Sequence, residues 1–122
     1  GSGTFAYGPP SCDPPAVADA IIQGTGNATH LGRFTIELGY CIDQDGNPLT
    51  PPSGIQTAAN GDQLFTQMVF SDVDPELGLF QDYIYDGGTG RFENAEGFIR
   101  LYTDFDLVNL TYSNHGEGWL AY

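Results

Sequence analysis

The sequence predicts an all-β protein, a small antiparallel β-barrel of about eight short strands. Three observations support this fold class: several segments alternate between apolar and polar side chains, 13% of the residues are aromatic, and turn-forming glycine, proline, asparagine and aspartate separate the segments. No segment has a convincing helical period. The 122 residues fit one domain with one hydrophobic core.

The strands are expected in order along the chain. The clearest pattern starts at Phe34, where one face carries Phe34, Ile36, Leu38, Tyr40 and Ile42 and the other carries Thr35, Glu37, Gly39 and Cys41. Residues 98–106 alternate again, with Ile99, Leu101, Thr103 and Phe105 opposite Arg100, Tyr102 and Asp104. Further strands are expected at residues 17–24, 55–59, 64–70, 79–85, 107–112 and 119–122. The intervening turns include residues 43–54, Asn60-Gly61, 71–78, the glycine-rich 86–90 and the NHGEG run 114–118.

Residues 1–16 are rich in proline and glycine and show no period, so they are expected to form an extended arm before a barrel of residues 17–122. Phe5 and Tyr7 alternate in this arm and could add to a sheet edge of another copy. Cys12 lies in the arm and Cys41 on the outer face of a strand. They predict a disulfide, within or between chains, with two free thiols as the alternative.

The net charge of −13 excludes several partners, because Arg33, Arg91 and Arg100 are the only fixed positive charges. Nucleic acid and anionic lipid both require a basic surface, and no apolar run is long enough for membrane insertion. The acidic composition and the cysteine pair favour a secreted, extracellular protein.

Calcium is the one cofactor that the sequence suggests. Alternate oxygen-bearing residues, the spacing of calcium loops, occur at Asp43, Asp45 and Asn47 and again at Asp72, Asp74 and Glu76. Neither run has a full calcium-binding loop, so solvated turn acids are the alternative.

The run GGTGRFENAEGFIRL, residues 87–101, resembles the glycine-rich strand-turn-strand signature of dirigent proteins and allene oxide cyclases. ATHLGRFT (28–35) and AANGD (58–62) are similar to secreted bacterial proteins with the same barrel. The resemblance implies an eight-stranded barrel with an apolar lumen. Plant members of the family steer radical coupling or close an epoxide-derived ring, but the His-Asp pair of dirigent proteins and the glutamate context of the cyclases do not occur here. The resemblance therefore implies the fold rather than an activity.

No catalytic residues are predicted. The only histidines, His30 and His115, fall in expected turns, outside any metal-ligand or general-base pattern, and no serine or cysteine lies in a nucleophile motif. Asn27 and Asn109 lie in sequons that matter only in a glycosylating source. An enzymatic role is left open, and the residues favour a non-enzyme.

Two functions follow from these observations. The first is an extracellular structural protein that self-assembles through its N-terminal arm into a homo-oligomer or filament. The second is a barrel that binds a small apolar ligand, or an isomerase-like or cyclase-like enzyme, with Asn60, Asp62, Tyr85 and Arg100 as the expected ligand-binding residues.

Overall fold

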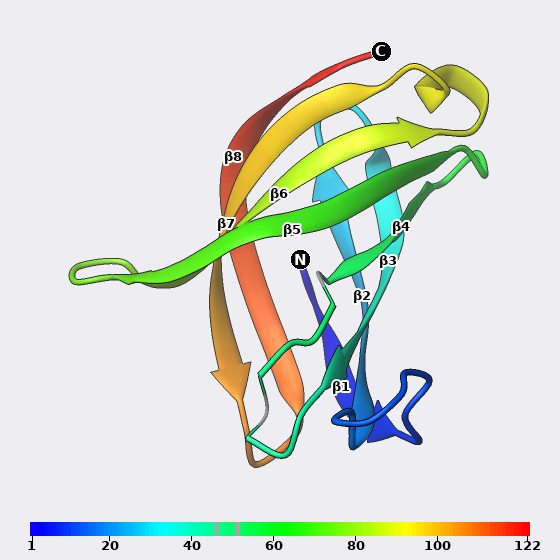
Figure 1. Cartoon of the computed structure of the whole chain (residues 1–122). Coiled ribbons are helices and arrows are strands. Elements are labelled where there is room, and N and C mark those ends of the chain that lie inside the picture. Colours follow the sequence, from blue (N-terminus) through cyan, green and yellow to red (C-terminus); the bar gives the residue numbers. More distant parts are fainter. Residues whose placement is uncertain (46, 51) are drawn as a thin grey trace.

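The computed structural model describes residues 1–45, 47–50 and 52–122. It is a closed barrel of eight antiparallel strands in sequence order (Figure 1), which confirms the predicted fold class. Gly46 and Pro51 of the predicted long turn lie outside the described residues. The strands are β1 (Ser2–Gly8), β2 (Ala18–Ala28), β3 (Gly32–Ile42), β4 (Ser53–Ala58), β5 (Gln63–Asp74), β6 (Gly78–Gly88), β7 (Glu96–Asp106) and β8 (Thr111–Ala121), with one 3-10 turn, η1 (Gly90–Phe92).

The strand faces follow the sequence pattern. The predicted face of β3 lines the barrel interior through Phe34, Ile36, Leu38 and Tyr40, and the predicted face of β7 does so through Ile99, Leu101, Thr103 and Phe105. Because side chains alternate along a strand, the opposite faces point away from the interior.

Among the described residues, no helix has the length and apolar character to cross a bilayer.

The N-terminal segment differs from the expected arm, because residues 2–8 are a barrel strand. β1 pairs with β2 over its whole length, from Ser2 with Thr25 to Gly8 with Asp19, and its first three residues pair with β8. Phe5 is buried and its ring packs edge-on against Phe105 at 5.6 Å between centroids. The barrel thus begins before residue 17, and the dense prolines and glycines that follow β1 hid its alternation from the sequence analysis.

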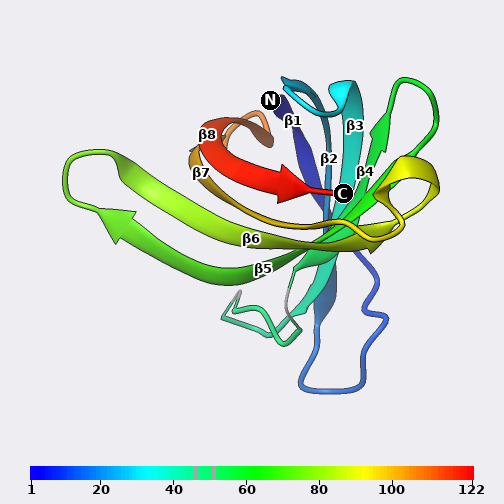
Figure 2. The same cartoon turned by 90° about the horizontal axis from the view of Figure 1, so that it is seen from above.

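The predicted NHGEG turn is also different, since residues 114–118 lie inside the continuous strand β8. A side chain at Gly116 or Gly118 would collide with a backbone carbonyl oxygen of β7, that of Arg100 or of Phe98. The glycines therefore permit a tightly coiled strand rather than a reversal. Figure 2 shows how strongly β8 curls over the barrel.

The chain reverses at residues 107–110, which were expected to be strand. There the Asp106 carboxylate accepts hydrogen bonds from the backbone N–H groups of Val108 and Asn109, and Leu110 takes a positive φ of 55°. Aspartate commonly begins turns by this kind of bond, a signal that the apolar run around it obscured.

One end of the barrel is closed by a small hydrophobic core. Phe92 and Leu64 are fully enclosed and Leu31, Ala58 and Ala95 complete the cluster. Phe92 and Ala95 belong to the glycine-rich run 87–101 and pack inward at this corner.

A disulfide ties the β1–β2 connection to the end of β3, near the opposite end of the barrel. The predicted bond joins Cys12 and Cys41 of the same chain, with 6.3 Å between their Cα atoms. Cys41 is almost fully buried beneath this connection.

Candidate ligand cavity inside the barrel

The interior of the barrel is a large cavity rather than a filled core. Its volume is about 1060 Å³, and every strand from β2 to β8 contributes to its wall. This is slightly above the range of small-molecule sites, about 300–1,000 Å³, and it includes space at an open mouth that the exposed Glu117 and Trp119 also line. Aromatic side chains of the wall include Phe34, Tyr40, Tyr83, Tyr85, Phe105 and Tyr112; aliphatic ones include Ile22, Ile36, Leu38, Met68 and Leu101.

The buried polar part of the wall is uncharged. It consists of the amide and hydroxyl side chains Gln56, Thr66, Gln81 and Thr103. Among the described wall residues, the groups that can carry charge near neutral pH are the Gly1 amino group and the side chains of His30, His115 and Glu117, and all four residues are exposed. A molecule inside the barrel would therefore meet no compensating charge.

Most of the inner polar groups are paired. The Thr103 hydroxyl donates to Oε1 of Gln81 at 2.6 Å, and the Thr66 hydroxyl donates to the backbone carbonyl of Ile84 at 3.3 Å. Among the described residues, Gln56 Oε1 is the one buried side-chain oxygen or nitrogen without a hydrogen-bond partner.

Four wall tyrosines have perturbed pKa values. Burial raises the pKa of Tyr85 to about 12, and burial also raises those of Tyr40 and Tyr112. The pKa of Tyr83 is raised further, by burial first and then by the neighbouring phenols Tyr40, Tyr112 and Tyr85. The phenols are thus neutral at ordinary pH and can act as hydrogen-bond donors.

The cavity opens beside β8. The seam that closes the barrel has three residue pairs between β1 and β8, and beyond Asn114 the described part of β8 pairs with β7 alone. Every residue from Asn114 to Leu120 lines the cavity, as do Gly1 and residues 27–31 across the gap. Residues on both faces of a strand can line the same cavity only where the edge of that strand is open. The gap between β8 and residues 27–31 is therefore an entrance to the cavity.

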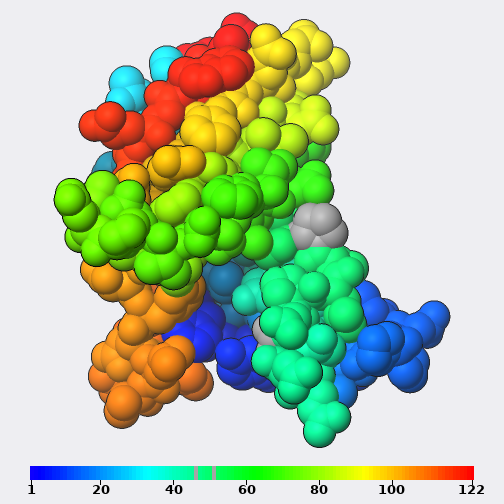
Figure 3. Space-filling model, turned by 60° about the vertical axis from the view of Figure 1, so that its left-hand side comes forward, coloured from blue at the N-terminus to red at the C-terminus, as the bar shows by residue number. Residues whose placement is uncertain are grey.

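The surface is also hollowed below β5. Figure 3 shows the hollow between β5 (green), the β7–β8 segment (orange) and the segment that follows β3 (teal). Pro48, Pro52, Ser71 and Leu79 line the cavity on this side.

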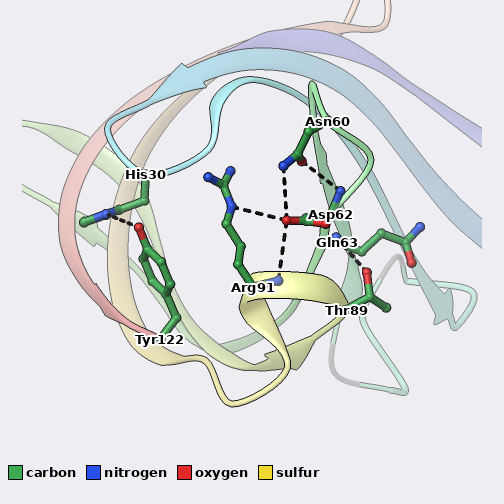
Figure 4. A network of polar contacts seen from close by, with 7 residues as sticks. All are labelled: His30, Asn60, Asp62, Gln63, Thr89, Arg91 and Tyr122. Carbon is green, nitrogen blue, oxygen red and sulfur yellow. Dashed lines mark hydrogen bonds and ion pairs between the residues drawn. The ribbon is translucent and has the colours of Figure 1, made fainter.

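Two of the four predicted ligand-binding residues hold a corner of the barrel instead (Figure 4). Asp62 accepts a hydrogen bond from the Asn60 side chain at 3.2 Å and forms an ion pair with Arg91 at 3.5 Å. The same carboxylate lies against Gly90, where a side chain would collide with it. The AANGD and GGTG runs thus pack on each other, which explains their composition structurally.

Arg100 lies on the outer face of the barrel. It donates two hydrogen bonds to the buried Asp82 carboxylate, at 2.7 and 2.9 Å, and its guanidinium stacks over Phe80. The hydrogen bonds from Arg100 hold the pKa of Asp82 below its usual value. Of the predicted ligand-binding residues, Tyr85 alone lines the cavity.

The inner glutamines and threonines were missed because sequence motifs favour charged side chains as binding residues. The period of two residues indicates which way they point. Gln56 shares a strand face with Ala58, and Ile55 and Thr57 lie on the opposite face.

Both histidines were expected in turns, but only one of them lies in a turn. His30 does lie in the β2–β3 turn, where its ring nitrogen Nδ1 is 3.4 Å from the Tyr122 hydroxyl (Figure 4). His115 lies within β8 and stacks on Tyr102 with 5.9 Å between the ring centroids.

The acidic turns are organised by backbone hydrogen bonds. Asp43 accepts the backbone N–H groups of Asp45 and Asn47, and Asp74 accepts those of Glu76 and Leu77, which lowers the Asp74 pKa. Asp72 accepts the backbone N–H of Val73. Within the described ranges, no three histidine, cysteine, aspartate or glutamate side chains group as a metal site.

Comparisons of this chain with protein-family models, curated proteins and solved structures gave no match. The cavity is therefore the feature from which a function can be proposed.

Proposed function

We propose that this barrel binds a small, uncharged, mainly apolar molecule in its interior and acts as a carrier or reservoir for it. The single observation that supports this function is the cavity of about 1060 Å³ with its aromatic and aliphatic wall. An empty cavity with so much apolar wall lacks the packing energy that a filled core would supply. A bound ligand offsets this cost.

The wall favours a neutral ligand. Burying a charge without a partner costs several kcal/mol or more, which is about the whole binding free energy of a weak ligand. The inner polar groups are amides, hydroxyls and phenols, which pair with uncharged donors and acceptors. The net charge of −13 further disfavours anions through long-range repulsion.

The disulfide fits an oxidising compartment, and we include an extracellular location in the proposal. Assembly through residues 1–16 receives less support from the geometry, since Phe5 is buried against the chain's own Phe105. The arm would have to leave its own barrel, where β1 pairs with β2 and β8, before it could dock on another copy.

Binding of the neutral fluorophore N-phenyl-1-naphthylamine tests the proposal. Its fluorescence is expected to rise saturably, with one site per chain, on titration with the wild-type protein. Ile36→Trp fills the cavity and is expected to weaken binding at least tenfold. Thr35→Trp, on the outer face of the same strand, is the matched control and is expected to bind like the wild type.

Circular dichroism would verify that each variant keeps its strand content, and Leu101→Phe provides a milder way to fill the cavity. Lack of saturable binding by the wild type, or equal binding by the Ile36→Trp and Thr35→Trp variants, would contradict the proposal.

A further inference from the structure

We infer that Gln56 is the hydrogen-bond anchor of the cavity and that the ligand carries a neutral donor, a hydroxyl or an amide N–H, which its Oε1 accepts. The inference rests on the proposed function and deepens it, because it names the polar group that the ligand must have. The starting observation is that Gln56 is 7% exposed, lines the cavity and has an unpartnered Oε1.

The neighbours of Gln56 on the sheet cannot supply the missing donor. Its register partners are Ile36 on β3 and Leu64 on β5, which have apolar side chains. On its own strand the residues of the same face are Gly54 and Ala58, neither of which has a polar side chain. The environment is therefore apolar on all four sides within the sheet.

The nearest hydroxyl on the sheet is already in use. Thr66 on β5 pairs with Gly54, next to Gln56 on the same face, and its hydroxyl donates to the Ile84 carbonyl. A hydroxyl has a single hydrogen to donate, so Thr66 cannot also satisfy Gln56. What remains is a donor from inside the cavity, which the almost fully covered Oε1 meets when the terminal amide of Gln56 turns toward it.

Gln81 provides an internal comparison. It is buried to nearly the same degree, at 8% exposed, and it also lines the cavity, but its Oε1 already accepts the Thr103 hydroxyl. Two glutamines of one cavity thus differ in whether the protein itself fills the acceptor. Buried polar groups without partners are rare in folded proteins, and a binding site is one reason that they persist.

The test compares 2-naphthol, which has a hydroxyl donor, with 2-methylnaphthalene, which has a methyl group instead. Each is titrated as a competitor of N-phenyl-1-naphthylamine. The preference for 2-naphthol, the ratio of the two dissociation constants, is expected to fall about tenfold in Gln56→Met, since a bond to an otherwise unpaired buried acceptor is lost. Gln67→Met, at an exposed glutamine on the outer face of β5, is the control and is expected to keep the wild-type preference.

An unchanged preference in Gln56→Met, with both compounds still bound, would overturn the role of Gln56 and leave the proposed function intact. Absence of binding of all three compounds by the wild type would overturn both. A second measurement needs no variant: the side-chain amide signals of Gln56 in a nitrogen–proton NMR spectrum are expected to shift more with 2-naphthol than with 2-methylnaphthalene, which acts on them through its ring alone. The reverse result would also reject the inference.

Discussion

Thr103 on β7 donates its hydroxyl hydrogen to Oε1 of Gln81 on β6 across 2.6 Å, inside the barrel. The bond lets an amide and a hydroxyl sit in an otherwise apolar wall. It also fills the Gln81 acceptor from within the protein, whereas Thr66, which stands in the same relation to Gln56, donates to a backbone carbonyl instead.

We expect Thr103→Val to destabilise the fold by about 1–3 kcal/mol, because the valine keeps the shape of threonine and leaves the Gln81 acceptor unpaired. Urea denaturation would measure the change. Thr35→Val, on the exposed outer face of β3, is the control and is expected to stay within about 0.5 kcal/mol of the wild type. A Thr103→Val protein as stable as the wild type would show that the bond contributes nothing.

Gly118→Ala should destabilise the barrel by about 2 kcal/mol or more, since the new methyl group would meet the Phe98 carbonyl of the neighbouring strand. Gly39→Ala in β3 is the matched control, because its methyl group would approach the Ala20 carbonyl at an ordinary 3.7 Å. Thermal denaturation of the two variants would compare them. Equal midpoints would mean that β8 can relax without its glycine.

The Cys12–Cys41 disulfide closes a loop with a sequence separation of 29, for which chain entropy predicts a stabilisation of about 3–4 kcal/mol. The double variant Cys12→Ala/Cys41→Ala is expected to lose this amount in urea denaturation. A reducing agent should lower the stability of the wild type and leave the double variant unaffected. A wild type that is insensitive to reduction would argue against the predicted loop effect.

The buried phenols make the fold sensitive to alkali. The Tyr85 pKa is raised from 10.0 to about 12, so the folded protein keeps a proton that the unfolded chain has lost. The stability contributed by the neutral phenol is complete below pH 10 and is lost as the pH rises from about 10 to 12. Ultraviolet absorbance of phenolate, followed against pH, should show part of the titration delayed into this window. Tyr85→Phe should reduce the delayed part, and an unchanged delayed part would mean that Tyr85 does not contribute to it.

The strands with one buried face could be predicted well, as β3 and β7 show, because a period of two residues fixes which side chains face inward. Alternation could not reveal β1, where Phe5 and Tyr7 are followed by a connection dense in proline. It also could not distinguish a coiled strand from a turn in NHGEG, because glycine permits both.

The candidate site could be predicted in kind but not in its residues. A barrel that binds a small apolar ligand was one of the two expected functions, and Tyr85 does line the interior cavity. Asn60, Asp62 and Arg100 drew attention because they are polar or charged, yet they support a corner and the outer face. Whether Gln56 Oε1 has a hydrogen-bond partner depends on its neighbours on β3 and β5, and only the folded sheet brings these residues together.

The seam between β1 and β8 bears on how the molecule is made. To close it, residues 2–4 must pair with residues 111–113 near the other end of the chain. The neighbouring hydrogen bond from Gly1 to Asn114 joins residues 113 positions apart. Contacts between such distant residues form late, after loop-closure entropy has been overcome. While a ribosome is still producing residues 111–113, β1 has no second neighbour, so the cylinder is an open sheet until synthesis has passed that point.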